Sequence, residues 1–137
     1  MNIDITSWND RAEGTFVALL GIELVTLDVG RVQSRLAIRP DHLAPNGYLH
    51  AASVVGLADT SAGVGCLRSL PDDAAGFTTI ELKSNFVGTL TGGAAACEAT
   101  LVHGGRTTQL WDAHVRNEET GKLLATFRCT QLVLYAR

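Results

Sequence analysis

Asp59 is the residue of this 137-residue sequence best suited to chemistry. It lies in the run LHAASVVGLADTSAGVGCL, and between His42 and Pro71 the only other formal charge is Arg68. An ionised carboxylate in such apolar surroundings is costly, and its pKa can rise toward the range that suits a general base. Asp59 is therefore a candidate catalytic group. The alternative is a buried carboxyl that hydrogen-bonds to backbone or to a neighbouring hydroxyl.

A candidate oxyanion site precedes Asp59. The segment PNGYLHAA, residues 45–52, places a turn directly before a helix. The first N–H groups of a helix have no internal partner and carry the positive end of its dipole, so they can hold a developing negative charge. Ala51 and Ala52 are small enough for a substrate carbonyl to approach their N–H groups.

These two candidate groups are far apart within one chain. Asp59 follows Ala51 by eight residues, which puts the two on nearly the same helix face but about 12 Å apart along the axis. One chain would hardly bring both groups to a single carbonyl, and a second chain could supply the missing half.

A buried helix is expected to carry these residues. Residues 49–67 are apolar or small on every side, which is typical of a helix surrounded by other structure. Their alanines and glycines let other backbone approach closely. A shorter helix is expected over residues 8–20, with Phe16, Leu19 and Leu20 facing inward.

The remaining segments predict antiparallel strands joined by turns. A hairpin is expected before the long helix, and a meander of four strands linked by glycine-containing turns after it. Runs of strands around one helix predict a single α+β domain over residues 1–137, with the helix packed on one antiparallel sheet. The expected strands are 22–27, 31–38, 78–90, 94–102, 106–116 and 122–135.

The stretch HLAPNGYLHAASVVGLADTSAG resembles the signature of the hotdog-fold acyl-CoA thioesterases related to the phenylacetate-degradation (PaaI-like) enzymes. That family has a His-Gly-Gly step, a helix, and an acidic residue eight positions after the first glycine. The likeness continues in Thr78–Lys83, Gly104–Arg106 and Glu119–Leu124, and it covers residues 22–133. It implies the hotdog fold, in which an antiparallel sheet wraps around one long central helix, and hydrolysis of an acyl-coenzyme A without a metal or redox cofactor.

The resemblance also implies roles for individual residues. Asp59 takes the place of the family's catalytic carboxylate, and Ala51 that of the glycine whose N–H polarises the thioester carbonyl. His50 corresponds to an orienting hydrogen-bonding residue, and Thr79 falls near a hydroxyl that helps to position water. The implied assembly is a homo-oligomer, a dimer or a tetramer, in which different subunits supply the helix start and the carboxylate of each active site.

Two positions depart from the family pattern. The Gly-Gly step is Ala51-Ala52 here, which keeps the N–H groups but adds two methyl groups beside the thioester. Many members have an asparagine six residues before the histidine, where this sequence has Ala44. Asn46, two residues later, is a candidate substitute for that asparagine.

Further residues are candidates for substrate binding. Ala52 would line the substrate, and Arg106 follows two glycines where its side chain could pair with a coenzyme A phosphate. A solvated turn residue is the alternative for Arg106. His103 and Lys83 are weaker candidates of the same kind. The histidines show no metal-ligand spacing with one another or with cysteine, so no metal site is expected.

Composition excludes several classes of partner. The net charge is −3 with scattered basic residues, which disfavours nucleic-acid binding. No run of 18 apolar residues and no signal-peptide pattern occurs, so a cytoplasmic protein without membrane contact is expected. Cys66, Cys97 and Cys129 are expected to be reduced and buried. A charged fraction of only 18% favours an oligomer.

The sequence therefore predicts an acyl-CoA thioesterase, with an aromatic acyl group as one candidate substrate and Asp59 as general base or nucleophile. One alternative is an enoyl-thioester hydratase or dehydratase on the same fold, although the sequence has no motif for its histidine–carboxylate arrangement. Another is a non-catalytic acyl-CoA-binding protein, which the Ala51-Ala52 step makes plausible.

Overall fold

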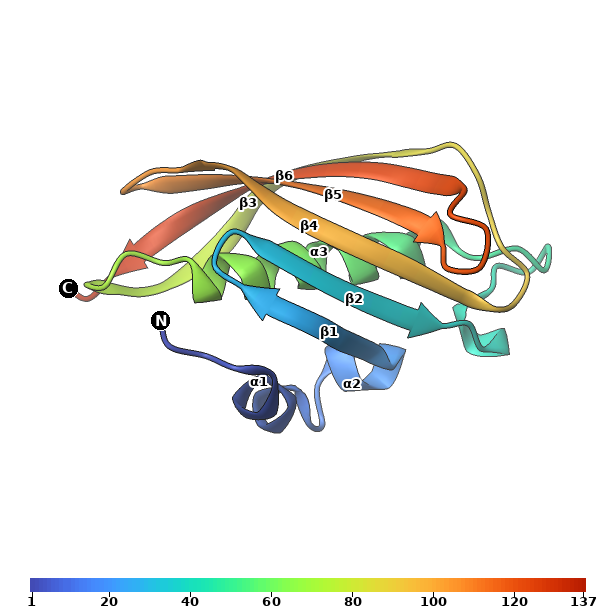
Figure 1. The fold of residues 1–137 in the computed structure, drawn as a ribbon, viewed down its shortest axis with the longest axis horizontal. Coiled ribbons are helices and arrows are strands. Elements are labelled where there is room, and N and C mark those ends of the chain that lie inside the picture. The colour runs from blue at the N-terminus through green and yellow to red at the C-terminus, as the bar shows by residue number, and fades with distance from the viewer.

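In the computed structural model, which describes residues 1–137, one six-stranded sheet wraps around one long helix (Figure 1). This arrangement confirms the predicted α+β class. The strands are β1 (Ile22–Asp28), β2 (Arg31–Ala37), β3 (Ala74–Phe86), β4 (Ala94–Gly104), β5 (Thr108–Asn117) and β6 (Leu123–Tyr135). The helices are α1 (Ile5–Ala12), α2 (Phe16–Leu20) and the long α3 (Ala51–Arg68), with a short 3-10 turn at Pro40–His42.

The strand order is β1-β2-β4-β5-β6-β3, and all neighbours are antiparallel. The predicted meander is right for β4, β5 and β6, but it is wrong for β3, which pairs with β6 at the far edge. The connection over residues 87–93 is too long for a tight hairpin. Its beginning is held by β6, because the N–H groups of Val87 and Gly88 both donate to the Leu124 carbonyl. The hairpin strand β2 occupies the edge of β4 instead.

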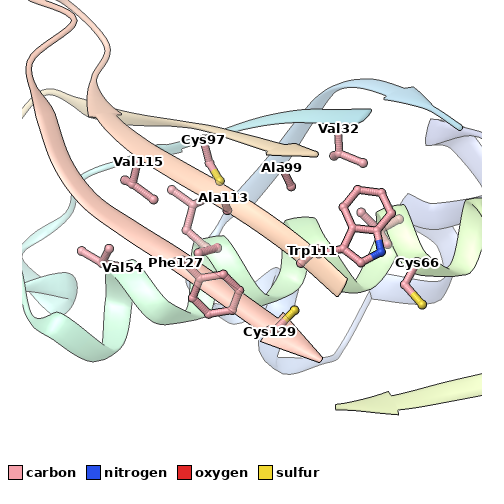
Figure 2. Packing of buried hydrophobic residues seen from close by; sticks show 14 of the residues in the cluster. Val32, Val54, Cys66, Cys97, Ala99, Trp111, Ala113, Val115, Phe127 and Cys129 are labelled. Atoms are coloured by element: carbon pink, nitrogen blue, oxygen red, sulfur yellow. The ribbon is translucent and has the colours of Figure 1, made fainter. Parts of the chain in front are cut away.

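Helix α3 packs lengthwise against one face of the sheet (Figure 1). Figure 2 shows side chains such as Val54, Trp111 and Phe127 in the layer between helix and strands, within one cluster of 23 buried hydrophobic residues. A Cβ atom on Gly65 would lie 2.6 Å from the Trp111 ring. The small residues of α3 thus permit close packing, as expected, but aromatic and aliphatic side chains approach them instead of backbone.

The predicted helix over residues 8–20 is wrong in one respect, because the segment forms two helices. Gly14, just after α1, has a φ of 73°, a left-handed conformation that turns the chain, and the Thr15 hydroxyl donates back to the Ala12 carbonyl of α1 (2.6 Å). This break changes the direction in which the apolar side chains of α2 point. Phe16 and Leu19 are 62% and 70% exposed instead of facing inward, whereas Leu20 packs against α3 at Gly56, where the edge of the Phe16 ring also makes contact.

Other predicted features are confirmed with shifted boundaries. Strand β3 begins at Ala74, four residues before the predicted start, because a turn in which the Ala74 N–H donates to the Pro71 carbonyl leads directly from α3 into the strand. The three cysteines are free and buried, as predicted. None of the helices is both long enough and apolar enough to cross a membrane.

Candidate active site

The Asp59 carboxyl lies on the side of α3 that faces β3 and β6. Its Oδ1 atom is buried and has no hydrogen-bond partner. Burial, the largest cause, raises the pKa of Asp59, and the side chain of Thr79 on β3 lies beside the carboxyl. The neighbouring Ser61 hydroxyl donates its hydrogen to the Leu57 carbonyl (2.7 Å) and not to Asp59. The Oδ1 atom is therefore not satisfied in the way that a purely structural role would require.

Thr79 connects Asp59 to strand β6. The Thr79 hydroxyl donates a 2.7 Å hydrogen bond to Oε1 of Gln131, the residue paired with it across the two strands. Cys129, two residues before Gln131, also faces Asp59. Burial, and secondarily the charge of Asp59, raises the pKa of this thiol to about 12. Cys129 therefore adds no charge beside Asp59 at neutral pH.

The start of α3 presents one free donor. His50 is the N-cap residue, and its Nδ1 atom accepts a 2.9 Å hydrogen bond from the Ala52 N–H. The Ala51 N–H, in contrast, donates to no acceptor in the chain. Both alanines are exposed. Of the two donors proposed from the sequence, Ala51 is available to a ligand and Ala52 is occupied.

His42 holds the start of α3 in place, a role that the sequence analysis missed. Its buried ring accepts from the Arg39 N–H at Nδ1 (2.9 Å), so the neutral ring donates from Nε2 to the Leu20 carbonyl (2.7 Å). The His42 carbonyl accepts from the His50 N–H (2.9 Å) and from the Ser53 hydroxyl (2.9 Å). No local sequence pattern predicts this network, because it joins segments distant in the chain.

Asn46 shapes the turn that precedes the helix. Its Oδ1 atom accepts from the Tyr48 N–H (3.2 Å), and Gly47 adopts a φ of 87°. The N–H group of Gly47 closes the turn onto the Ala44 carbonyl (2.9 Å). The side-chain amide of Asn46 is exposed, and its nitrogen has no partner within the chain.

The predicted phosphate-binding residues lie apart from Asp59 and from the helix start. Arg106 makes a two-bond ion pair with Asp73 (2.8 and 3.3 Å) and stacks on Tyr135. Asp73 follows the far end of α3, a helix about 27 Å long. His103 is exposed near the end of β4, and Lys83 lies on the exposed sheet face beside Arg128. These residues do not gather with the catalytic candidates in one chain.

A cavity of about 260 Å³ opens beside the start of α3. Its lining is mostly apolar and includes three residues of the helix start; it consists of Phe16, Leu20, Asp41, Leu43, His50, Ala52 and Ser53. A larger cavity of about 420 Å³ lies on strands β1, β2, β4 and β5, but none of the predicted site residues lines it. Of these two cavities, the smaller one borders the start of α3.

Comparisons with known proteins identify a family for this chain. Residues 46–124, which include the helix start, Asp59 and Thr79, match the family described as the thioesterase superfamily. The 1,4-dihydroxy-2-naphthoyl-CoA hydrolase of Listeria monocytogenes is 32% identical over 111 residues, 81% of this chain and 89% of that protein.

Two solved structures share the fold. A thioesterase of Haemophilus influenzae superposes with a TM-score of 0.91 at 23% identity, covering 98% of this chain and 93% of that one. The PaaI protein from the phenylacetic acid degradation operon of Escherichia coli superposes with a TM-score of 0.83 at 19% identity, covering 93% and 90% of the two chains.

Proposed function

Because the chain belongs to the thioesterase superfamily and is a thioester hydrolase, we propose that it cleaves an acyl-coenzyme A to a free acid and coenzyme A, with Asp59 as the catalytic carboxylate. One observation carries the proposal for Asp59. Its buried Oδ1 atom has no partner, in surroundings that raise the pKa of the carboxyl. Perturbed carboxyls of this kind occur preferentially at active sites.

The proposed reaction uses the two groups of helix α3. The free Ala51 N–H polarises the thioester carbonyl, and Asp59 takes a proton from water as the water oxygen adds to the carbonyl carbon. The tetrahedral intermediate then collapses, the C–S bond breaks, and the proton passes to the departing sulfur. In the second form of the proposal, the Asp59 carboxylate attacks directly and expels the thiolate, and water opens the resulting anhydride.

Each active site combines two subunits in this proposal. Along one helix the Ala51 N–H and Asp59 are about 12 Å apart, too far to act on one carbonyl. Strand β3, at the edge of the sheet, supports a dimer, because an uncovered edge with apolar side chains tends to pair. From its middle to the residue that follows it, β3 exposes four large apolar side chains: Ile80 (55%), Leu82 (42%), Phe86 (47%) and Val87 (60%).

We place the partner along β3 for a further reason. Thr79 lies on the same strand and faces Asp59, so a copy docked there would bring its own helix start close to this carboxylate. By its resemblance to the PaaI-like enzymes, the dimer would pair further into a tetramer.

The cavity at the helix start supports a bulky apolar acyl group. Phe16 and Leu20 line it opposite His50 and Ala52. The similar Listeria protein is named for an aromatic acyl-CoA substrate. We therefore propose an aromatic acyl group as the preferred substrate.

Release of free thiol from a panel of acyl-CoAs tests the proposal. Aromatic and straight-chain thioesters are incubated with the protein, and thiol and acid are both quantified. The proposal expects equal amounts of thiol and acid, with the aromatic substrates fastest. A hydratase would change the absorbance of an enoyl-CoA without releasing thiol, and a binding protein would do neither. Either result would contradict the proposed reaction.

A further inference from the structure

Gln131 carries a fully buried side-chain amide and is paired with Thr79 across strands β3 and β6. It lies on β6 and has no exposed surface. Its Oε1 atom accepts the hydrogen of the Thr79 hydroxyl (2.7 Å), and its Nε2 atom donates to Sγ of Cys129 (3.4 Å). Gln131 therefore makes no direct contact with the candidate catalytic carboxyl, and its bond to Thr79 is the one that touches the hydroxyl beside Asp59.

The direction of the Thr79 hydrogen bond matters for Asp59. A hydroxyl has a single hydrogen to donate. Because Thr79 donates that hydrogen to Gln131, its oxygen offers only lone pairs on the side where Asp59 lies. This accounts for the Oδ1 atom of Asp59, which is buried without a donor although a hydroxyl is its neighbour.

The same direction suits an attacking water. A water molecule between Asp59 and Thr79 would meet two acceptors, and it could donate one hydrogen to each. Its own lone pair would then be free for the carbonyl carbon of the substrate.

We propose that Gln131 is a positioning residue for the hydrolysis: it holds the hydrogen of the Thr79 hydroxyl, so that the Thr79 oxygen accepts from the attacking water and Asp59 receives no internal hydrogen bond. This inference rests on the proposed function of Asp59. It adds a residue 52 positions from Thr79 in the sequence.

The other ionisable groups around Asp59 do not compete with this effect. Cys129 faces it from β6 and Cys66 lies on α3, and burial raises the pKa of each thiol to about 12. Glu81 on β3 is exposed and accepts from the Thr130 hydroxyl. Burial is the largest influence on the titration of Asp59, and it raises the pKa of the carboxyl.

The substitution Gln131→Met tests the proposal. It keeps the side-chain length and removes the acceptor, so the Thr79 hydrogen can turn to Asp59. We expect the pKa of Asp59 to fall by roughly one unit, and kcat to fall about 10-fold with little change in KM. The pKa is measured by carbon NMR of labelled aspartate carboxyls and by the acidic limb of the kcat profile. An unmoved pKa would overturn the proposal.

Gln109→Met is the matched control. Gln109 is paired with Gln131 across β5 and β6 and is equally buried, but it binds Trp111 and the Ser69 carbonyl instead of Thr79. Its substitution should lower stability without moving the pKa of Asp59. A similar pKa shift in both variants would show a general structural effect and would contradict the assigned role.

Thr79→Val decides the matter even where Gln131→Met does not fold. If the hydroxyl hydrogen points away from Asp59, its removal leaves the pKa of Asp59 nearly unchanged while kcat falls. A rise of roughly one unit would show that Thr79 donates to Asp59, and the proposal would be wrong. In a Thr79→Val background, Gln131→Met should no longer move the pKa.

The inference and the proposed function fail in different ways. A wild-type protein that releases no thiol removes the proposed function, yet the NMR titration still decides how Gln131 acts on Asp59. In the converse case, Asp59→Asn abolishes hydrolysis while Gln131→Met leaves the pKa of Asp59 unchanged. That pair of results would overturn the inference and leave the proposed function standing.

Discussion

At the scale of single residues, Asp59 stands out in the sequence as a lone charge in an apolar run, and its proposed catalytic role can be tested by substitution. Asparagine has nearly the same size and also accepts hydrogen bonds, but it cannot take a proton or attack as a carboxylate. We expect Asp59→Asn to lower kcat at least about 10²-fold. The melting temperature should hold or rise, because a costly buried charge is removed while the shape is kept.

Kinetics and thermal melts on one preparation of this variant distinguish a catalytic role of Asp59 from a structural one. A purely structural carboxyl predicts the reverse pattern, a less stable protein with unchanged activity per folded molecule. Full turnover by a well-folded variant would therefore end the role proposed for Asp59.

The raised pKa of Asp59 also predicts a pH dependence of stability. A carboxyl whose folded-state pKa lies above the unfolded value contributes stability at low pH, and this contribution is lost as the pH rises through the folded-state pKa. The stability of Asp59→Asn relative to the wild type should therefore increase from about pH 4 toward neutrality.

Melting curves of both proteins across this range measure the difference. The lowered pKa values of Asp73, Asp112 and Glu118 favour the opposite trend, but these ion-paired carboxyls are common to both proteins and cancel. A difference in stability that is constant with pH would mean that Asp59 titrates normally.

Residues of the site differ in how far the sequence predicts them. Asp59 was found because a lone charge in an apolar run is visible without knowing the fold. Gln131 and His42 were not, since their importance depends on partners across the sheet or across the loop before α3. Gln131 faces Thr79 only because of the register between β3 and β6, which no local pattern encodes.

At the scale of elements, the start of α3 carries a prediction of its own. The methyl group of Ala51 is exposed beside the free N–H. Ala51→Gly should keep activity and broaden the range of acyl groups, whereas Ala51→Val should block the approach of the carbonyl. The measurement is kcat/KM across the acyl-CoA panel. Unchanged turnover and selectivity in the valine variant would show that this helix end does not face the substrate.

The elements themselves were predictable where one periodicity persisted. The apolar run of α3 and the alternation of β2 were both found. The prediction of one helix over residues 8–20 was wrong, because Gly14 adopts a left-handed conformation. The chain turns there, and the side chains of α2 point in other directions than a continuous helix would give them. The exposed Phe16 side chain then borders the cavity at the helix start, a location that depends on tertiary packing.

At the scale of the whole molecule, the proposed dimer predicts that a charge on β3 will disrupt assembly. Lysine on an edge strand opposes pairing with another edge. Ile80→Lys should convert the protein to a folded monomer with greatly reduced activity, as measured by light scattering and thiol release. Val102→Lys is the control, since Val102 is similarly exposed but lies on β4. A stable monomeric wild type with full activity would refute the shared site.

The global order of the strands was the least predictable part of the fold. Their number and direction follow from turns and alternation, but the choice of neighbour for β3 does not. That choice gives β3 its open edge and places Thr79 opposite Gln131, so it bears on both the proposed assembly and the proposed chemistry.

The buried cysteines have a practical consequence for handling this protein. Burial raises the pKa of Cys66, Cys97 and Cys129 to about 12, 11 and 12. Near pH 8 only roughly one molecule in a thousand or fewer would carry a thiolate at any of these sites, and none is open to a bulky reagent. A chromogenic disulfide dye added to the native protein should therefore register only liberated coenzyme A. On denaturation three sulfhydryls per chain become titratable, so one dye reports both product formed and the fraction of protein that has lost its structure.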